Sequence, residues 1–219
     1  MSSHVLRLAL ASAALLSGAH SQLTLTLLDA TATPRGGRCA DGTMAGFYIH
    51  EGTDPSLFVI FMEGGGACYD EVTCTKRSRM HLGSSKSWAS TMPGSYTYDS
   101  DCLSNPDFCT ATHAYVAYCT GDLHAGNNTS PSPESWGLYF DGHANFVAIV
   151  SELQQKHGLN SAERVPGVAT LARSRGVTGN PRGVGPGIFF AAQLFVTRLT
   201  LKTAAFFRAP TKNHLGAAG

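Results

Sequence analysis

The most informative segment of the chain reads Leu57-Phe58-Val59-Ile60-Phe61-Met62-Glu63-Gly64-Gly65-Gly66. Its six consecutive apolar residues are typical of a central strand that is buried on both faces of a sheet. Three glycines follow at once, and without Cβ atoms their peptides can turn sharply and present N–H groups to a ligand. The stretch predicts a core strand that runs into a functional loop, although a tight structural turn would use the same residues.

The neighbouring segments predict further strands. Residues 23–27 alternate apolar and polar side chains, which is typical of a half-buried strand, and residues 46–50 form a second candidate. The turn residues of 51–56 connect this second strand to the core strand, so we expect the two to form a hairpin. Residues 115–119 are another strand candidate.

A helix is predicted over residues 142–156, where Lys156 and His157 suit the negative end of the helix dipole and Gly158 provides a stop. Buried strands followed by a helix indicate the α/β class, in which another core strand should come next. The predicted face of this helix consists of Phe140, Ala144, Val147, Val150 and either Leu153 or Gln154.

Residues 1–20 have the pattern of a secretory signal peptide. Arg7 precedes an apolar run over residues 8–16, and small residues follow at 17–19. The run is too short to span a bilayer. We therefore expect a secreted, extracellular chain with no membrane span.

Export changes the interpretation of the cysteines, since an even number in an oxidising compartment favours disulfides. The short spacing of Cys68 and Cys74 favours a local bridge, and the remaining connectivity is open. The alternative is a zinc site, but the close C-x-x-C spacing that is typical of such sites is missing. The six candidates are Cys39, Cys68, Cys74, Cys102, Cys109 and Cys119. Overlapping sequons at Asn127 and Asn128 predict a glycosylated surface loop.

The charge distribution divides the chain near residue 163. Residues 1–163 carry 8 Lys/Arg and all 15 Asp/Glu, whereas residues 164–219 carry 8 Lys/Arg and no acid. The basic residues of 164–219 are scattered among apolar ones, and the formal net charge is only +1, so we expect no nucleic-acid partner. We interpret 21–163 as the front part of a domain and 164–219 as an atypical basic tail that is not its native continuation.

The glycine-rich stretch, together with Cys68 and Cys74, resembles the signature loop of the pectin acetylesterases and of their relatives, the Notum-type carboxylesterases. Several other stretches agree with the family in the same order. The resemblance extends from Cys39 to Glu163 and includes residues 39–42, 82–86, 103–108, 118–122 and 158–163.

The resemblance implies an α/β-hydrolase-like fold with disulfide-rich loops and a secreted serine carboxylesterase that uses a Ser-His-Asp triad without a metal or other cofactor. The implied substrates are acylated polysaccharides, such as pectin in the cell wall, or acylated proteins. The N–H groups of Gly65, Gly66 and Ala67 are candidate oxyanion donors. Family members often carry a bulky aromatic residue at the position of Ala67.

The sequence departs from the family where the nucleophile is expected. After Glu163, residues 164–168 read Arg-Val-Pro-Gly-Val in place of a Gly-x-Ser-x-Gly elbow, and that motif occurs nowhere in the chain. Ser85 does not follow a core strand, and His214 has no Asp partner after residue 163. No catalytic residue is identifiable, so we expect a truncated, inactive hydrolase with an incomplete sheet, present as a monomer. The alternatives are a non-catalytic secreted glycoprotein that retains the scaffold, and a disulfide- or zinc-stabilised module without esterase ancestry.

Overall fold

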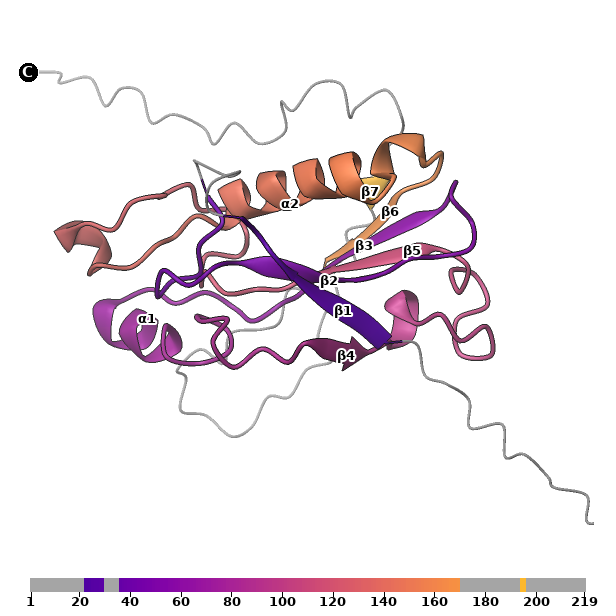
Figure 1. Ribbon diagram of the computed structural model, residues 1–219. Coiled ribbons are helices and arrows are strands. Elements are labelled where there is room, and N and C mark those ends of the chain that lie inside the picture. The colour runs from indigo at the N-terminus through magenta and orange to yellow at the C-terminus, as the bar shows by residue number, and fades with distance from the viewer. Residues whose placement is uncertain (1–21, 30–35, 170–193, 196–219) are drawn as a thin grey trace, which may run out of the picture.

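The computed structural model describes residues 22–29, 36–169 and 194–195. These residues form a seven-stranded mixed sheet with the strand order β4-β1-β2-β5-β3-β6-β7, and the long helix α2 lies along one face of it (Figure 1). The strands are β1 (Gln22–Leu27), β2 (Gly46–His50), β3 (Phe58–Met62), β4 (Thr91–Pro93), β5 (Thr112–Val116), β6 (Pro166–Ala169) and β7 (Leu194–Phe195). The α-helices are α1 (Glu71–Arg77) and α2 (Gly142–Lys156), and short 3₁₀ turns cover Tyr96–Tyr98, Pro133–Ser135 and Leu159–Ser161.

The central position of β3 was predicted from its run of apolar residues and is confirmed. It pairs in parallel with β5 on one side and with β6 on the other; Ile60 lies opposite Ala114 and Gly167. The expected core strand after α2 is β6. Strands β1 and β2 pair antiparallel, and β2 is also antiparallel to β5.

The predicted hairpin of residues 46–50 with the core strand is wrong, because β5 lies between β2 and β3. The connection after β2 crosses the start of β5: Gly52 N donates to Thr112 Oγ1 (3.0 Å), and Thr112 N donates to Leu57 O (3.0 Å). A Cβ atom on Gly52 would collide with the carbonyl of Ala111. The strand predicted at 115–119 accordingly begins earlier, at Thr112.

Helix α2 has the predicted bounds, and its buried face was predicted in part, since Ala144 and Leu153 are buried as expected. Ile149 and Leu153 are fully buried against the sheet, in a core that includes Phe47 and Phe58, and each contributes about 1.5–3 kcal/mol of burial free energy. Val147, which was predicted to be buried, is 46% exposed. The predicted face began at Phe140, which precedes the helix and pairs with Asn128 instead, and it missed the buried Ile149.

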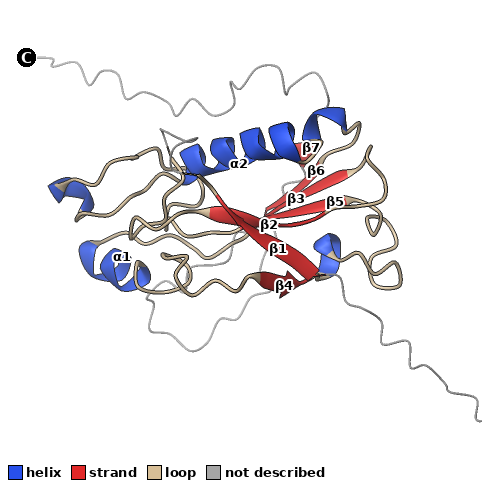
Figure 2. Ribbon diagram, in the orientation of Figure 1, coloured by secondary structure: helices blue, strands red, loops and turns tan. Residues whose placement is uncertain are grey.

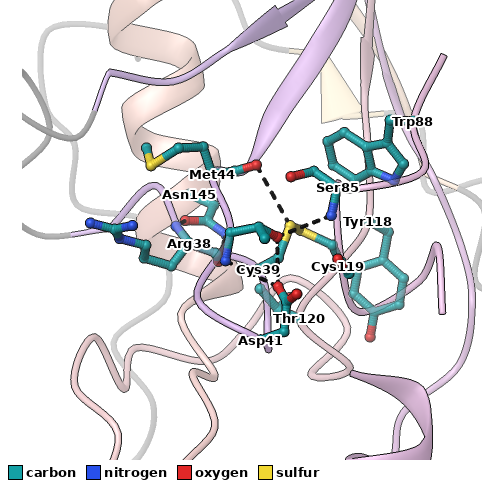
Figure 3. Close-up of a disulfide and its surroundings, with 12 residues drawn as sticks. Arg38, Cys39, Asp41, Met44, Ser85, Trp88, Tyr118, Cys119, Thr120 and Asn145 are labelled. Atoms are coloured by element: carbon teal, nitrogen blue, oxygen red, sulfur yellow. Dashed lines mark hydrogen bonds between the residues drawn. A yellow bond between two sulfur atoms is a disulfide. The ribbon is translucent and has the colours of Figure 1, made fainter. Parts of the chain in front are cut away.

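Three disulfides confirm the expectation for the cysteines: Cys39–Cys119, Cys68–Cys74 and Cys102–Cys109. No described cysteine is left as a thiolate, which argues against the zinc alternative. Figure 3 shows Cys39–Cys119 between Asn145 of α2 and the segment that carries Ser85 and Trp88. Disulfides and loops dominate residues 63–111, where regular elements are short (Figure 2).

The expected signal peptide, residues 1–20, and most of the expected tail lie outside the described residues. Within the described ranges, no helix combines the length and the apolar character needed to cross a bilayer.

Candidate functional site

The carboxyl ends of the parallel strands meet at one edge of the sheet, which is where α/β proteins bind ligands. Met62 of β3 lies opposite Val116 of β5 and Ala169 of β6, so all three strands end side by side. Residues 63–68, which we call the glycine loop, leave β3 at this edge. The sequence-predicted loop therefore starts where a site is expected.

Three side chains hold the carbonyl groups of the glycine loop. Arg77 Nη2 donates to Gly65 O (3.0 Å), and Tyr118 Oη donates to Gly66 O (3.0 Å). His124 Nε2 lies 2.9 Å from Glu63 O; because a carbonyl only accepts, this nitrogen carries the proton. Three carbonyls are thereby fixed to protein donors from three separate segments.

Three consecutive amide groups of the same loop, at residues 65–67, have no such partner. Among the described residues, no acceptor receives a hydrogen bond from the N–H of Gly65, Gly66 or Ala67. Cys68 N donates to Gly121 O (3.0 Å) and closes the loop. Gly66 adopts a φ of 68°, in the left-handed region that favours glycine. Residues 65–67 thus carry three consecutive backbone donors without a described acceptor; Gly66 is buried, and Gly65 and Ala67 are partly exposed.

Tyr118 shapes the loop as well as holding it. A Cβ atom on Gly65 would lie 2.7 Å from the Tyr118 ring, so the close approach of ring and backbone requires glycine. The Tyr118 side chain is almost completely buried, and this burial raises the pKa of its hydroxyl to about 12. The hydroxyl stays protonated; it accepts from Leu123 N (2.7 Å) while it donates to Gly66 O.

Glu63 ties the start of the loop to the end of β5. Its backbone N–H donates to Val116 O (3.0 Å), and its carboxylate accepts from Tyr118 N (2.8 Å). Burial raises the pKa of the Glu63 carboxyl group, and the hydrogen bond from Tyr118 opposes this shift. The contacts indicate a positioning role for Glu63 within the scaffold.

His124 adopts a left-handed φ of 58° and stacks near the Tyr118 ring, at a centroid distance of 4.7 Å. Burial lowers its pKa, which favours the neutral ring that donates to Glu63 O. The neighbouring Asp122 accepts from Thr120 Oγ1 (2.6 Å) and from Gly142 N at the start of α2 (2.8 Å). No sequence pattern singles out His124, Arg77 or Tyr118 as site residues; the stretch 118–122 enters only as part of the resemblance.

Other sequence candidates lie elsewhere. Ser85 N donates to Thr43 Oγ1 (3.0 Å), and Ser85 O accepts from Trp88 N (3.1 Å), so this serine lies beside the Cys39–Cys119 disulfide (Figure 3). His214 is outside the described residues. Two surface hollows, on α1 and beside Asp41, are not lined by the glycine loop. In the described ranges, no three His, Cys, Asp or Glu side chains are arranged to hold a metal.

Residues 16–166 match the family model described as pectinacetylesterase. The chain belongs to the pectinacetylesterase family. The resemblance inferred from the sequence motifs is confirmed, and residues 167–219 lie outside the match.

Individual pectinacetylesterase relatives agree with this assignment. Pectin acetylesterase 4 of Arabidopsis thaliana is 30% identical over 146 residues, which are 66% of this chain and 36% of the relative. The palmitoleoyl-protein carboxylesterase Notum of Schmidtea mediterranea is 31% identical over 144 residues, which are 64% of this chain and 27% of the relative.

The crystal structure of the Wnt deacylase Notum from Drosophila matches the fold with a TM-score of 0.61 and 25% identity, over 68% of this chain and 43% of that one. The α/β-hydrolase-like fold with disulfide-rich loops is confirmed. The chain spans less than half of the length of each of these relatives.

Proposed function

We propose that the described residues are the oxyanion-binding part of a carboxylic ester hydrolase that removes acetyl groups from acylated cell-wall glycans. Gly65, Gly66 and Ala67 would donate backbone hydrogen bonds to the oxygen that becomes negative when the ester carbonyl is attacked. Preorganised donors of this kind stabilise the developing charge without reorganising during the reaction. The proposal includes a secreted location, which the leader-like residues 1–20 support.

One observation carries the proposal: side chains fix the carbonyls of Glu63, Gly65 and Gly66, while the N–H groups of residues 65–67 have no acceptor among the described residues. A loop that served only as a turn would gain stability by using its amides as well. Here Arg77, Tyr118 and His124 set the direction of the peptides from the carbonyl side. The donors are thereby oriented before any substrate arrives.

The substrate class is inferred from two kinds of relatives. Their names give pectin acetylesterase in one case and palmitoleoyl-protein carboxylesterase in the other. Ala67 places a small side chain beside the donors, where relatives often have a bulky aromatic residue. We favour a short acyl group on a pectin-like polysaccharide, with an acylated protein as the other outcome of the test.

We further propose that this chain does not catalyse the reaction itself. The carboxyl end of β6 lies beside the start of the glycine loop, where a nucleophile is needed, but the sequence around β6 contains no Gly-x-Ser-x-Gly motif. The same observation favours a second candidate, a non-catalytic secreted glycoprotein that retains the scaffold.

A chimera tests the site independently of this missing element. Residues 1–165 would be joined to the part of Arabidopsis pectin acetylesterase 4 that begins with its nucleophile strand, and release of acetate from acetylated pectin would be compared with release of palmitoleate from an acylated peptide. We expect deacetylation to dominate. A chimera that folds and cleaves only the acylated peptide would overturn the substrate assignment.

The donor assignment needs a matched pair of variants in the same chimera. Ala67→Pro removes the N–H of residue 67, whereas Ala67→Ser keeps it. Loss of one oxyanion donor costs about 10²–10³ in kcat, so we expect a loss of that size for the proline variant alone. Equal activity of the two variants would refute the oxyanion role. The unmodified chain, assayed with p-nitrophenyl acetate, should show no turnover that a serine-reactive inhibitor blocks.

A further inference from the structure

The loop of residues 122–130, between β5 and α2, is fixed from its inner side. The Asp122 carboxylate accepts hydrogen bonds from His124 N (3.1 Å) and Gly142 N (2.8 Å). A Cβ atom on Gly126 would collide with this carboxylate, so no space remains on the inner side at that residue. Of the residues that follow in this loop, Asn127 and Ser130 are exposed to solvent.

The two overlapping sequons begin immediately after this point and differ in their environment. Asn127 is exposed, whereas Asn128 is partly buried. Asn128 N donates to Phe140 O (2.7 Å), and Phe140 N donates to Asn128 O (3.2 Å), so the backbone of Asn128 is held in an antiparallel bridge. Successive side chains along an extended segment point to opposite sides, which directs Asn127 outward and Asn128 toward the protein.

We propose that the exported chain is N-glycosylated on Asn127 and not on Asn128. The Asn127 amide nitrogen forms a bond to the anomeric carbon of a lipid-linked oligosaccharide. The bond between that carbon and the pyrophosphate oxygen breaks, the lipid pyrophosphate leaves, and the amide loses one proton. Both sequons satisfy the sequence rule for this modification, so the folded environment makes the distinction. The proposal rests on export of the chain and is independent of ester hydrolysis.

The glycan would stand beside the candidate site. Two residues of the same loop contact the machinery around the glycine loop, since His124 Nε2 donates to Glu63 O and Leu123 N donates to the Tyr118 hydroxyl. A glycan on Asn127 follows these anchors by only a few residues on the solvent side. It would flank the edge of the sheet where β3 and β5 end.

Two substitutions separate the sequons without changing either asparagine. Thr129→Ala destroys the sequon of Asn127 and leaves that of Asn128, and Ser130→Ala does the reverse. The full chain and both variants would be secreted from a eukaryotic cell line, and their masses compared before and after treatment with peptide N-glycosidase F. Conversion of asparagine to aspartate by that enzyme identifies the modified residue in a peptide digest.

We expect one glycan on the wild-type chain and on Ser130→Ala, located at Asn127, and none on Thr129→Ala. A glycan that survives Thr129→Ala but not Ser130→Ala would overturn the assignment. A parallel set with a heterologous signal peptide isolates the export step. If the glycan appears only in that set, the leader interpretation fails and the assignment to Asn127 holds; if it appears in neither set, the assignment fails.

Discussion

Asp141 provides the sharpest test of the structure, because a negative charge on its buried carboxyl group would have no hydrogen-bond partner among the described residues. Its side chain is 0% exposed, and neither carboxyl oxygen has a hydrogen-bond partner among the described residues. Burial and, second, the negative charge of Asp122 together raise the pKa of Asp141 to about 7, although the nearby groups of Arg38 and Asn145 oppose the shift. We therefore expect Asp141 to be protonated in the folded chain below neutral pH.

The sign and size of the effect follow from proton linkage. Because the folded pKa lies above the unfolded value of 3.8, the native state binds the extra proton between these two values, and stability falls as the pH rises. One pKa unit corresponds to about 1.4 kcal/mol, so the full difference is about 4 kcal/mol. The contribution is fully present near pH 4 and is lost above about pH 7.

Asp141→Asn removes the titration while keeping the shape of the side chain. Urea unfolding of both proteins should give free energies whose difference changes by about 4 kcal/mol between pH 4 and pH 8.5, with the variant gaining relative to wild type as the pH rises. Other groups with raised pKa values, such as Glu63, titrate equally in both proteins and cancel. A difference that stays constant across this pH range would refute the buried, protonated state of Asp141.

Three further predictions concern other parts of the fold. The pKa of fully buried His113 is lowered to about 4 by burial, so stability should fall as the pH drops from 6.5 toward 4, by about 3 kcal/mol; His113→Phe should flatten that limb of the urea-unfolding profile. Replacing Cys39 and Cys119 by serine removes a disulfide that closes a loop of 80 residues, whereas the Cys102–Cys109 disulfide closes a loop of seven. The first replacement should therefore lower the free energy of unfolding by about 2 kcal/mol more than the second, which thermal unfolding under matched conditions would measure. Tyr118→Phe should speed exchange of the hydrogen-bonded Cys68 amide, which closes the glycine loop, at least several-fold by mass-spectrometric hydrogen exchange. Tyr48→Phe, whose hydroxyl bonds Ala89 O, should leave that amide unchanged.

The features that local sequence patterns determine were predicted well. An unbroken apolar run was enough to identify β3 as the central strand, and the glycine after the last charged residues was enough to end α2 at Lys156. The buried face of α2 was predicted only in part, since Ala144 and Leu153 are buried as expected but a position between them was wrong. The choice of Val147 over Ile149 shows the size of that error.

Pairing between distant segments was not accessible from the sequence. β5 inserts between β2 and β3 although the chain reaches it only after a long, disulfide-bonded excursion, and no local pattern in residues 46–62 indicates that partner. The side chains that bind the carbonyls of the glycine loop are likewise distant from it in the sequence. Arg77, Tyr118 and His124 reach their carbonyls across sequence separations of 12, 52 and 61 residues, so each side chain by itself is indistinguishable from an ordinary polar residue.

The positions of these side chains in the sequence also explain how a chain can keep the backbone donors and lack the attacking group. The contacts that fix the carbonyls of Glu63, Gly65 and Gly66 come from residues before the end of the 122–130 loop, and none of these three side chains belongs to β6. An α/β-hydrolase nucleophile, in contrast, depends on the turn that follows its own strand. A change of sequence after Glu163 can therefore remove the attacking hydroxyl while leaving the orientation of the backbone donors intact. For this reason the oxyanion role is better tested by restoring a nucleophile strand than by assaying this chain alone.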